Sequence, residues 1–114
     1  MIDWMYFRNS WNSCKKVQEV LDTNNLEAEN KTDARKEKLE ADAVWDLMGS
    51  AERIVVAKGK SVATFVPEED DRDTILKAVL GRSGSLRAPT VKTGNAFFVG
   101  YNDTLYTDVP FANG

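Results

Sequence analysis

The chain has 114 residues, 42% of them hydrophobic, and a formal net charge of −3, which is typical of one soluble globular domain over residues 1–114. The acidic balance argues against binding to nucleic acids or to an anionic membrane, and no apolar run approaches the length of a membrane span. A single cysteine excludes an internal disulfide and fits a reducing cytoplasm, while the absence of histidine excludes Ser-His-Asp and Cys-His catalysis and most zinc sites.

The first part of the chain alternates between strand and helix patterns. Residues 2–7 are aromatic and branched, which predicts an interior strand. Apolar residues at helical spacing then predict an amphipathic helix from Cys14 to about Asn24. Residues 26–30 alternate like a short strand near a sheet edge, and the mixed charges of residues 31–38 indicate a solvated loop that leads into the next helix.

The middle of the chain continues with a helix and a hairpin. The helix after the charged loop ends just before a glycine, and we expect Leu39, Ala43 and Leu47 on its inner face. Residues 54–57 and 61–66 then predict a strand, a tight turn and a second strand.

The last third predicts one helix, one hairpin and a short terminal helix. The acidic run 68–71 offers either metal ligands or, more typically for adjacent carboxylates, a solvated helix start. A helix should follow at about 73–80, and residues 89–99 predict a hairpin around Thr93-Gly94-Asn95. Residues 103–107 predict the short terminal helix.

The turn between the first strand and the first helix holds the only cysteine. Asn12 or Ser13 is suited to cap the helix, and Cys14 begins it. Backbone N–H groups at a helix start point outward without partners, and the helix dipole favours negative charge there, so a thiol at this place can have a lowered pKa. The segment Trp11-Asn12-Ser13-Cys14 has the spacing of a Cys-x-x-Cys redox pair with tryptophan in the first position.

Several segments together carry a resemblance to a known family. Residues 6–21 have the pattern of an active-site strand, turn and helix, residues 87–91 (RAPTV) that of a loop with a cis-proline, and residues 94–106 that of a closing hairpin. The Lys-Gly-Lys…Phe segment at 58–65 and the loop at 84–90 add to these. The chain thereby resembles the glutaredoxin and ArsC (arsenate reductase)-like family of thioredoxin-fold proteins, most closely its ArsC-family selenoproteins.

The resemblance implies a thioredoxin-like α/β fold of the glutaredoxin/ArsC type, with a mixed sheet of about four strands flanked by helices. It also implies thiol–disulfide oxidoreductase chemistry in a monomer without a bound cofactor or metal. The partner would be a thiol or disulfide protein or a small thiol, with glutathione or thioredoxin as electron donor. In that family the first residue of Cys-x-x-Cys attacks the target and the second resolves the mixed disulfide. Here Trp11 stands in the first place, and tryptophan cannot attack a disulfide.

The resemblance further implies a set of substrate-binding residues. Arsenate reductases of the family hold an oxyanion with arginines near the turn, but without a nucleophile we do not expect arsenate reduction. The peptide bond between Ala88 and Pro89 should be cis, and the backbone of Ala88 could pair with a substrate segment by strand addition. The implied set is Asn12, Ser13, Arg53, Arg87, Ala88, Pro89 and Thr90.

Two roles are open for Cys14. It could be the nucleophile of a one-thiol oxidoreductase, with its thiolate stabilised by the helix start and by Lys15 and Lys16. It could equally be a small buried hydrophobe, because its helical spacing places it in register with Val17 and Leu21.

Trp11 also has alternative interpretations. In a protein that keeps the fold and loses the chemistry, it could anchor an extended peptide or a partner protein in a groove beside Pro89, or it could merely cover the core. A third alternative concerns the gene, since the selenocysteine codon UGA differs from the tryptophan codon UGG by one base. Residue 11 could then stand in for a selenocysteine or a cysteine.

Overall fold

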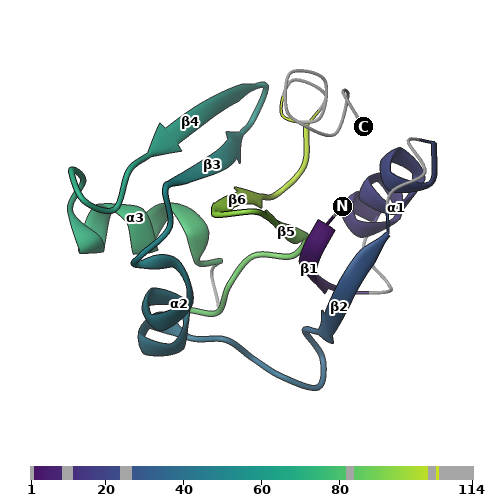
Figure 1. Cartoon of the computed structure of the whole chain (residues 1–114), viewed down its shortest axis with the longest axis horizontal. Coiled ribbons are helices and arrows are strands. Elements are labelled where there is room, and N and C mark those ends of the chain that lie inside the picture. Colours follow the sequence, from purple (N-terminus) through teal and green to yellow (C-terminus); the bar gives the residue numbers. More distant parts are fainter. Residues whose placement is uncertain (1, 9–11, 24–26, 82–83, 103–104, 106–114) are drawn as a thin grey trace.

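The computed structural model describes residues 2–8, 12–23, 27–81, 84–102 and 105, and it shows one mixed sheet with helices on both faces (Figure 1). In chain order the elements are β1 (Ile2–Phe7), α1 (Asn12–Thr23), β2 (Ala28–Asp33), α2 (Ala41–Met48), β3 (Arg53–Lys58), β4 (Ser61–Phe65), α3 (Arg72–Val79), β5 (Thr90–Thr93) and β6 (Ala96–Val99). The strand order is β2-β1-β5-β6-β3-β4. The β1/β2 and β3/β6 pairs are parallel, and the other neighbours are antiparallel.

The sheet has six strands, so the expected number of about four is wrong. The additional strands are β3 and β4, which form the hairpin predicted between residues 54 and 66. Strand β3 pairs in parallel with β6, and the hairpin therefore extends the same sheet instead of standing apart from it. Burial of apolar side chains favours this pairing. Ile54, Val55, Val56 and Ala57 of β3 are all buried, with successive side chains on opposite faces of the sheet.

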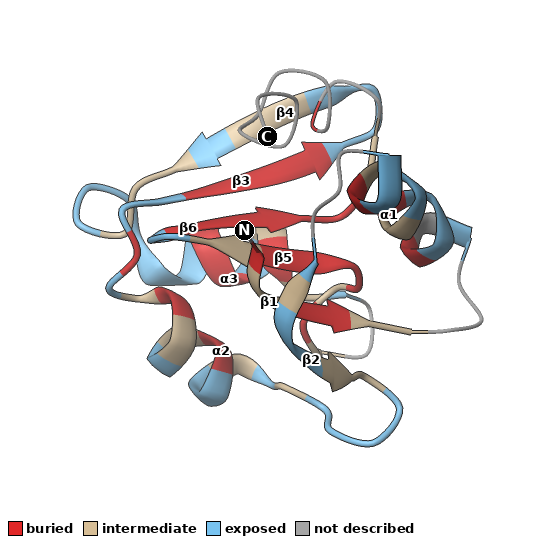
Figure 2. Ribbon diagram, turned by 45° about the vertical axis from the view of Figure 1, so that its right-hand side comes forward, coloured by how far each residue is buried: buried red, intermediate tan, exposed pale blue. Residues whose placement is uncertain are grey.

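Two hydrophobic clusters lie on opposite faces of the sheet. Figure 2 shows that the inner strands β3 and β6 between them are mostly buried. The α1-side cluster holds Ile2, Met5, Val17, Leu21, Val55, Ala57, Val91, Ala96, Phe98 and Leu105. The α2/α3-side cluster holds Tyr6, Cys14, Val44, Met48, Ala51, Ile54, Val56, Ile75, Leu76, Val79, Leu86, Ala88, Phe97 and Val99. Successive residues of β3 and β6 alternate between the two clusters, as the period of two in a strand requires.

Two details differ from the sequence predictions. Strand β2 runs from Ala28 to Asp33 and so takes in charged residues that were expected in a loop. This is possible because β2 is an edge strand in which no residue is buried. In α2 the buried residues are Val44 and Met48, whereas Ala43 is exposed. The buried face of α2 is thus shifted by one residue from the predicted one. The helix begins only at Ala41, and Val44 and Met48, which are four residues apart and larger than alanine, pack against the sheet.

The acidic run at residues 68–71 connects β4 to α3 through hydrogen bonds to the backbone. The Asp71 carboxylate accepts from the backbone N–H of Thr74 at 3.3 Å and forms the N-cap of α3. The Asp70 carboxylate accepts from the backbone N–H of Val66 at 2.7 Å. Two of the four carboxylates therefore have a local structural role, which agrees with the helix-start interpretation.

Replacement of Asp71 by alanine should lower the free energy of unfolding by about 1 kcal/mol, because the first turn of α3 would lose its side-chain cap. Urea denaturation of Asp71→Ala beside Glu69→Ala measures this effect. Glu69 is exposed, and its replacement should change stability by less than about 0.5 kcal/mol. Equal stabilities of the two variants would show that the cap does not contribute.

Within the described residues, no helix is both long and apolar enough to cross a membrane. The predicted terminal helix at 103–107 lies almost entirely outside the described residues. Of that segment only Leu105 is described, and it is buried in the α1-side cluster.

Candidate functional site

The loop before β5 and the end of β1 lie side by side at one end of the sheet. Tyr6, near the end of β1, pairs with Thr90, the first residue of β5. Thr90 directly follows Pro89, and the Ala88–Pro89 peptide bond is cis, as predicted. The chain leaving β1 and the chain entering β5 are therefore neighbours at this point, and α1 starts from the same end.

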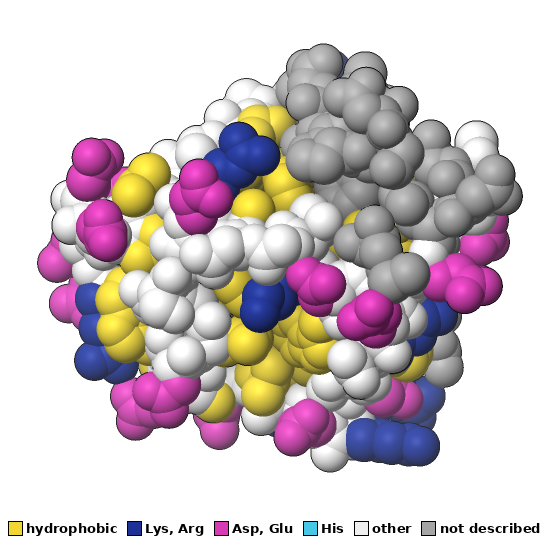
Figure 3. Space-filling view, viewed as in Figure 1, with side chains coloured by type: hydrophobic (Ala, Val, Ile, Leu, Met, Phe, Trp, Pro, Cys, Tyr) yellow, Lys and Arg dark blue, Asp and Glu magenta, His cyan; other side chains and the backbone are white. Residues whose placement is uncertain are grey.

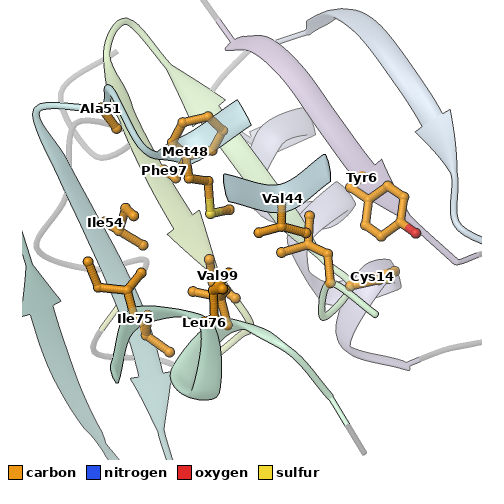
Figure 4. Packing of buried hydrophobic residues seen from close by; sticks show 14 residues of the cluster. Tyr6, Cys14, Val44, Met48, Ala51, Ile54, Ile75, Leu76, Phe97 and Val99 are labelled. Carbon is orange, nitrogen blue, oxygen red and sulfur yellow. The ribbon is translucent and has the colours of Figure 1, made fainter. Parts of the chain in front are cut away.

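Cys14 lies in this region, in the first turn of α1, with only 5% of its surface exposed. The backbone N–H of Arg8 donates a hydrogen bond to Sγ of Cys14 at 3.2 Å, which links the end of β1 to the start of the helix. Figure 4 shows Cys14 at the edge of the α2/α3-side cluster, below the ring of Tyr6. The thiol is thus packed in the core, in agreement with the second of its two sequence interpretations.

The environment of Cys14 favours the neutral thiol. Burial raises its pKa above the ordinary value, and the hydrogen bond from the Arg8 N–H opposes this shift only in part. Lys15 and Lys16, which were expected to stabilise a thiolate, are exposed, and the ammonium group of Lys16 lies over the ring of Tyr101 at 5.7 Å. As it stands, Cys14 has the character of a protected thiol and not of an activated nucleophile.

Three predicted residues precede Cys14 in the turn. Trp11 and the side chain of Ser13 lie outside the described residues. Asn12 is the first residue of α1 and is exposed.

The residues around the cis peptide are buried. Ala88 is 7% exposed, Pro89 is buried, and Thr90 is fully buried. The hydroxyl of Thr90 donates to the carbonyl oxygen of Arg87 at 2.7 Å, and the backbone N–H of Gly100 donates to the carbonyl oxygen of Pro89 at 2.8 Å. These bonds fix the loop from both sides and hold it beside the end of β1.

The guanidinium group of Arg87 is directed into the structure. Its Nη1 donates to the carbonyl oxygens of Ala57 at 3.2 Å and Ala78 at 3.4 Å, which join β3 to α3. Burial lowers the pKa of Arg87 because the charged form is partly desolvated. The side chain also lies where Gly100 leaves room, since a Cβ built on Gly100 would be 2.7 Å from Nη2. Arg87 therefore holds β3 and α3 together through these two hydrogen bonds.

Arg53 lies at the other end of the sheet. It pairs with Ala96 at the start of β6, and Ala96 in turn pairs with Thr93 at the end of β5. Its exposed guanidinium group lies over the ring of Phe98 at 6.0 Å. The structure does not bring Arg53 to the turn that contains Cys14.

The sequence analysis placed Tyr6 in the strand before the turn but assigned no role to its side chain. Its hydroxyl donates to the carbonyl oxygen of Glu37 at 2.7 Å and accepts from the backbone N–H of Leu39 at 3.2 Å. Burial raises its pKa, so the phenol stays neutral and holds the segment between β2 and α2 against β1. No motif marks this role, because the partners are backbone groups more than thirty residues away.

A cavity of about 180 Å³ adjoins Cys14. Its lining is Met5, Phe7, Cys14, Lys15, Gln18 and Lys31. Met5 and Lys31 are brought together by the parallel pairing of β1 with β2, where they are register partners. The sequence analysis placed Lys31 in a loop and therefore could not associate it with the cysteine.

A second hollow, of about 380 Å³, lies between α2 and strands β1 and β2, where hydrophobic side chains gather on the surface in Figure 3. Its apolar lining includes Trp4, Leu39 and Leu47, and Glu37 and Asp46 lie at its margin. The indole N–H of Trp4 donates to the hydroxyl of Thr32 at 2.9 Å. This hollow is separate from the cavity beside Cys14.

Comparison with known proteins adds no name to this site: no protein-family model matches the chain, and neither does any curated protein.

Proposed function

We propose that the chain is a thioredoxin-like domain of the glutaredoxin/ArsC type, built for thiol–disulfide exchange at the turn that contains Cys14. Strands β2, β1, β5 and β6 are adjacent in that order, with β1-α1-β2 as a parallel unit and β5-β6 as an antiparallel hairpin. This arrangement supports the thioredoxin-like assignment. The β3–β4 hairpin is then an addition to the edge of that four-strand unit.

The observation that carries the proposal is the placement of Cys14 relative to the cis-proline loop. The Tyr6–Thr90 pair sets the loop of Ala88 and Pro89 beside the end of β1, and the Arg8–Cys14 hydrogen bond holds the thiol at the same end. A buried thiol three residues after the attacking position suits the resolving step, in which a thiol needs to reach only a sulfur of its own chain.

In this proposal, the attacking thiol belongs to the residue at position 11. A thiolate there would attack a target disulfide, forming a mixed disulfide and releasing one target thiolate. The Cys14 thiolate would then attack the sulfur at position 11, releasing the second target thiol and leaving an intramolecular disulfide. Two electrons from a small thiol or a dithiol protein would restore the pair. With tryptophan at position 11 the first step cannot occur, and the protein keeps the site without turnover.

The Trp11→Cys variant tests this function. With glutathione or dithiothreitol as donor, we expect it to reduce a small model disulfide at least about 100-fold faster than the unmodified protein, since only the variant has an attacking thiol. The control is Trp11→Cys combined with Cys14→Ser, in which only the external thiol can resolve the mixed disulfide, so its turnover should be slower with a protein-sized target and should depend more steeply on the donor concentration. No rate gain in the folded Trp11→Cys variant would contradict the proposal.

The identity of native residue 11 decides whether the unmodified protein is active. Mass spectrometry of the native protein, together with the codon in its transcript, distinguishes tryptophan encoded by UGG from selenocysteine encoded by UGA. A selenocysteine would make a selenenylsulfide partner for Cys14 and would restore the full exchange cycle.

A binding role without chemistry is the second candidate, and the raised pKa of Cys14 favours it for the chain with tryptophan. Trp11 would then anchor an extended peptide or partner protein beside the Pro89 loop. In a screen with a library of extended peptides, Cys14→Ser should leave binding unchanged, and Trp11→Ala should abolish it without unfolding the protein.

A further inference from the structure

The two edges of the sheet differ in charge. Edge strand β2 carries Glu29, Lys31 and Asp33, and such charges oppose pairing with a further strand. The opposite edge strand, β4, has the sequence Ser-Val-Ala-Thr-Phe and no charged residue. Among the described residues no strand covers the outer side of β4. An uncharged, β-branched edge of this kind is a surface on which another strand can pair.

The geometry of the β3–β4 hairpin defines which backbone groups point outward. Lys58 and Ser61 are register partners on either side of the two-residue turn, so this pair and every second pair after it face inward and are hydrogen-bonded. The N–H and C=O groups of Val62 and Thr64 consequently point away from β3. The next outward N–H, that of Val66, donates to the Asp70 carboxylate at 2.7 Å. The open segment is thus short and centred on Ala63.

Opposite charges stand at the two ends of this segment. The end of β3 contributes Lys58, the turn before β4 contributes Lys60, and the segment after β4 contributes four acidic residues at 68–71. Figure 3 shows acidic side chains gathered at the left of the molecule, where β4 passes into α3. Two copies of β4 in antiparallel orientation would therefore place the basic end of each beside the acidic end of the other.

We infer that β4 is a self-association edge, at which two copies of this chain pair their β4 strands antiparallel about a two-fold axis beside Ala63. In that register Val62 faces Thr64 of the partner copy, and the two pairs exchange about four backbone hydrogen bonds. Cross-strand pairs of β-branched residues are favourable. The partner is a second copy and not an unrelated peptide, because a two-fold contact needs a self-complementary surface and a segment with one basic and one acidic end is self-complementary when antiparallel.

The resulting dimer should be weak and reversible, since a strand of five residues buries a small area. We expect sedimentation velocity to show a dimer fraction that rises between roughly 10 µM and 1 mM. This proposal is independent of the Cys14 site, which lies at the end of β1, and the rate gain of Trp11→Cys should be the same in monomer and dimer.

Charge reversal at the two ends provides the test. One variant combines Lys58→Glu with Lys60→Glu, and the other combines Glu68→Lys with Glu69→Lys. Alone, each should raise the dimer dissociation constant at least about tenfold: in the first variant like charges meet across the axis, and in the second the run 68–71 becomes net neutral and loses its attraction for the lysines. Mixed in equal amounts, the two variants should form a heterodimer in preference to either homodimer. In it the acidic run of the first variant meets Lys58 and Lys60 of the second, and the new glutamates of the first face the new lysines of the second.

Matched controls carry the same charge changes elsewhere on the surface. Lys36→Glu with Lys38→Glu, and Glu27→Lys with Glu29→Lys, alter exposed residues away from β4 and should leave the dissociation constant unchanged. A protein that is monomeric at 1 mM would overturn the inference. So would a dimer that the reversals do not weaken, or a mixture that forms no heterodimer.

Discussion

Replacing Phe98 by alanine is expected to lower the free energy of unfolding by about 3–5 kcal/mol, since the change removes a large buried ring and leaves a cavity. Phe98 is fully buried in the α1-side cluster. It pairs with Val91 on β5 and with Val55 on β3, so it joins the four-strand unit to the β3–β4 hairpin. Equilibrium denaturation in guanidinium chloride measures the loss.

Phe65→Ala is the matched control for this prediction, because it makes the same chemical change on edge strand β4. Phe65 is only partly buried, so its replacement should cost less than that of Phe98. Equal losses at the two positions would contradict the difference in burial between the two rings. A loss in Phe98→Ala below about 1 kcal/mol would contradict the packing described here.

Alkylation of Cys14 is expected to be at least about 100-fold slower in the native protein than in the denatured protein at pH 8, because the thiol is both covered and held neutral. Both rates are obtained by quenching the iodoacetamide reaction at a series of times and measuring the alkylated fraction by mass spectrometry. The native rate should continue to rise with pH beyond the pKa of the unfolded thiol. A fast native reaction with a lowered apparent pKa would mean an activated thiolate and would contradict the burial of Cys14.

The raised pKa of Cys14 also predicts that the stability of the protein depends on pH. The native state holds the Cys14 proton more tightly than the unfolded state does, because burial raises the pKa. The stabilising contribution is therefore complete below the unfolded pKa of about 8.5 and decreases as the pH rises from there through the folded pKa. Cys14→Ala removes this dependence, so the stability difference between the two proteins should shrink above about pH 9.

Much of the fold could be predicted from the sequence because local patterns determine it. The continuous apolar run at 54–57 predicted a strand, and the hairpin around Gly94 lies where the turn residues indicated it. The number of strands in one sheet could not be predicted in the same way. It depends on the parallel pairing of β3 with β6, two strands that lie forty residues apart in the sequence.

The site was less predictable than the fold. The helical spacing of Cys14 indicated its inward position, and the Ala88–Pro89 bond is cis as the resemblance implied. The roles of the arginines follow from tertiary contacts that no spacing encodes. Arg87 is directed to the carbonyl oxygens of Ala57 and Ala78, and Arg53 is carried by β3 to the far end of the sheet.

The most direct test of the central claim is the oxidation state of the Trp11→Cys variant in a dilute glutathione redox buffer, followed by mass spectrometry. If position 11 and Cys14 form the redox pair of a thioredoxin-like site, the oxidised monomer will contain one intramolecular disulfide between them and no free thiol. Two free thiols in the folded monomer, or cross-linked chains alone, would contradict that account.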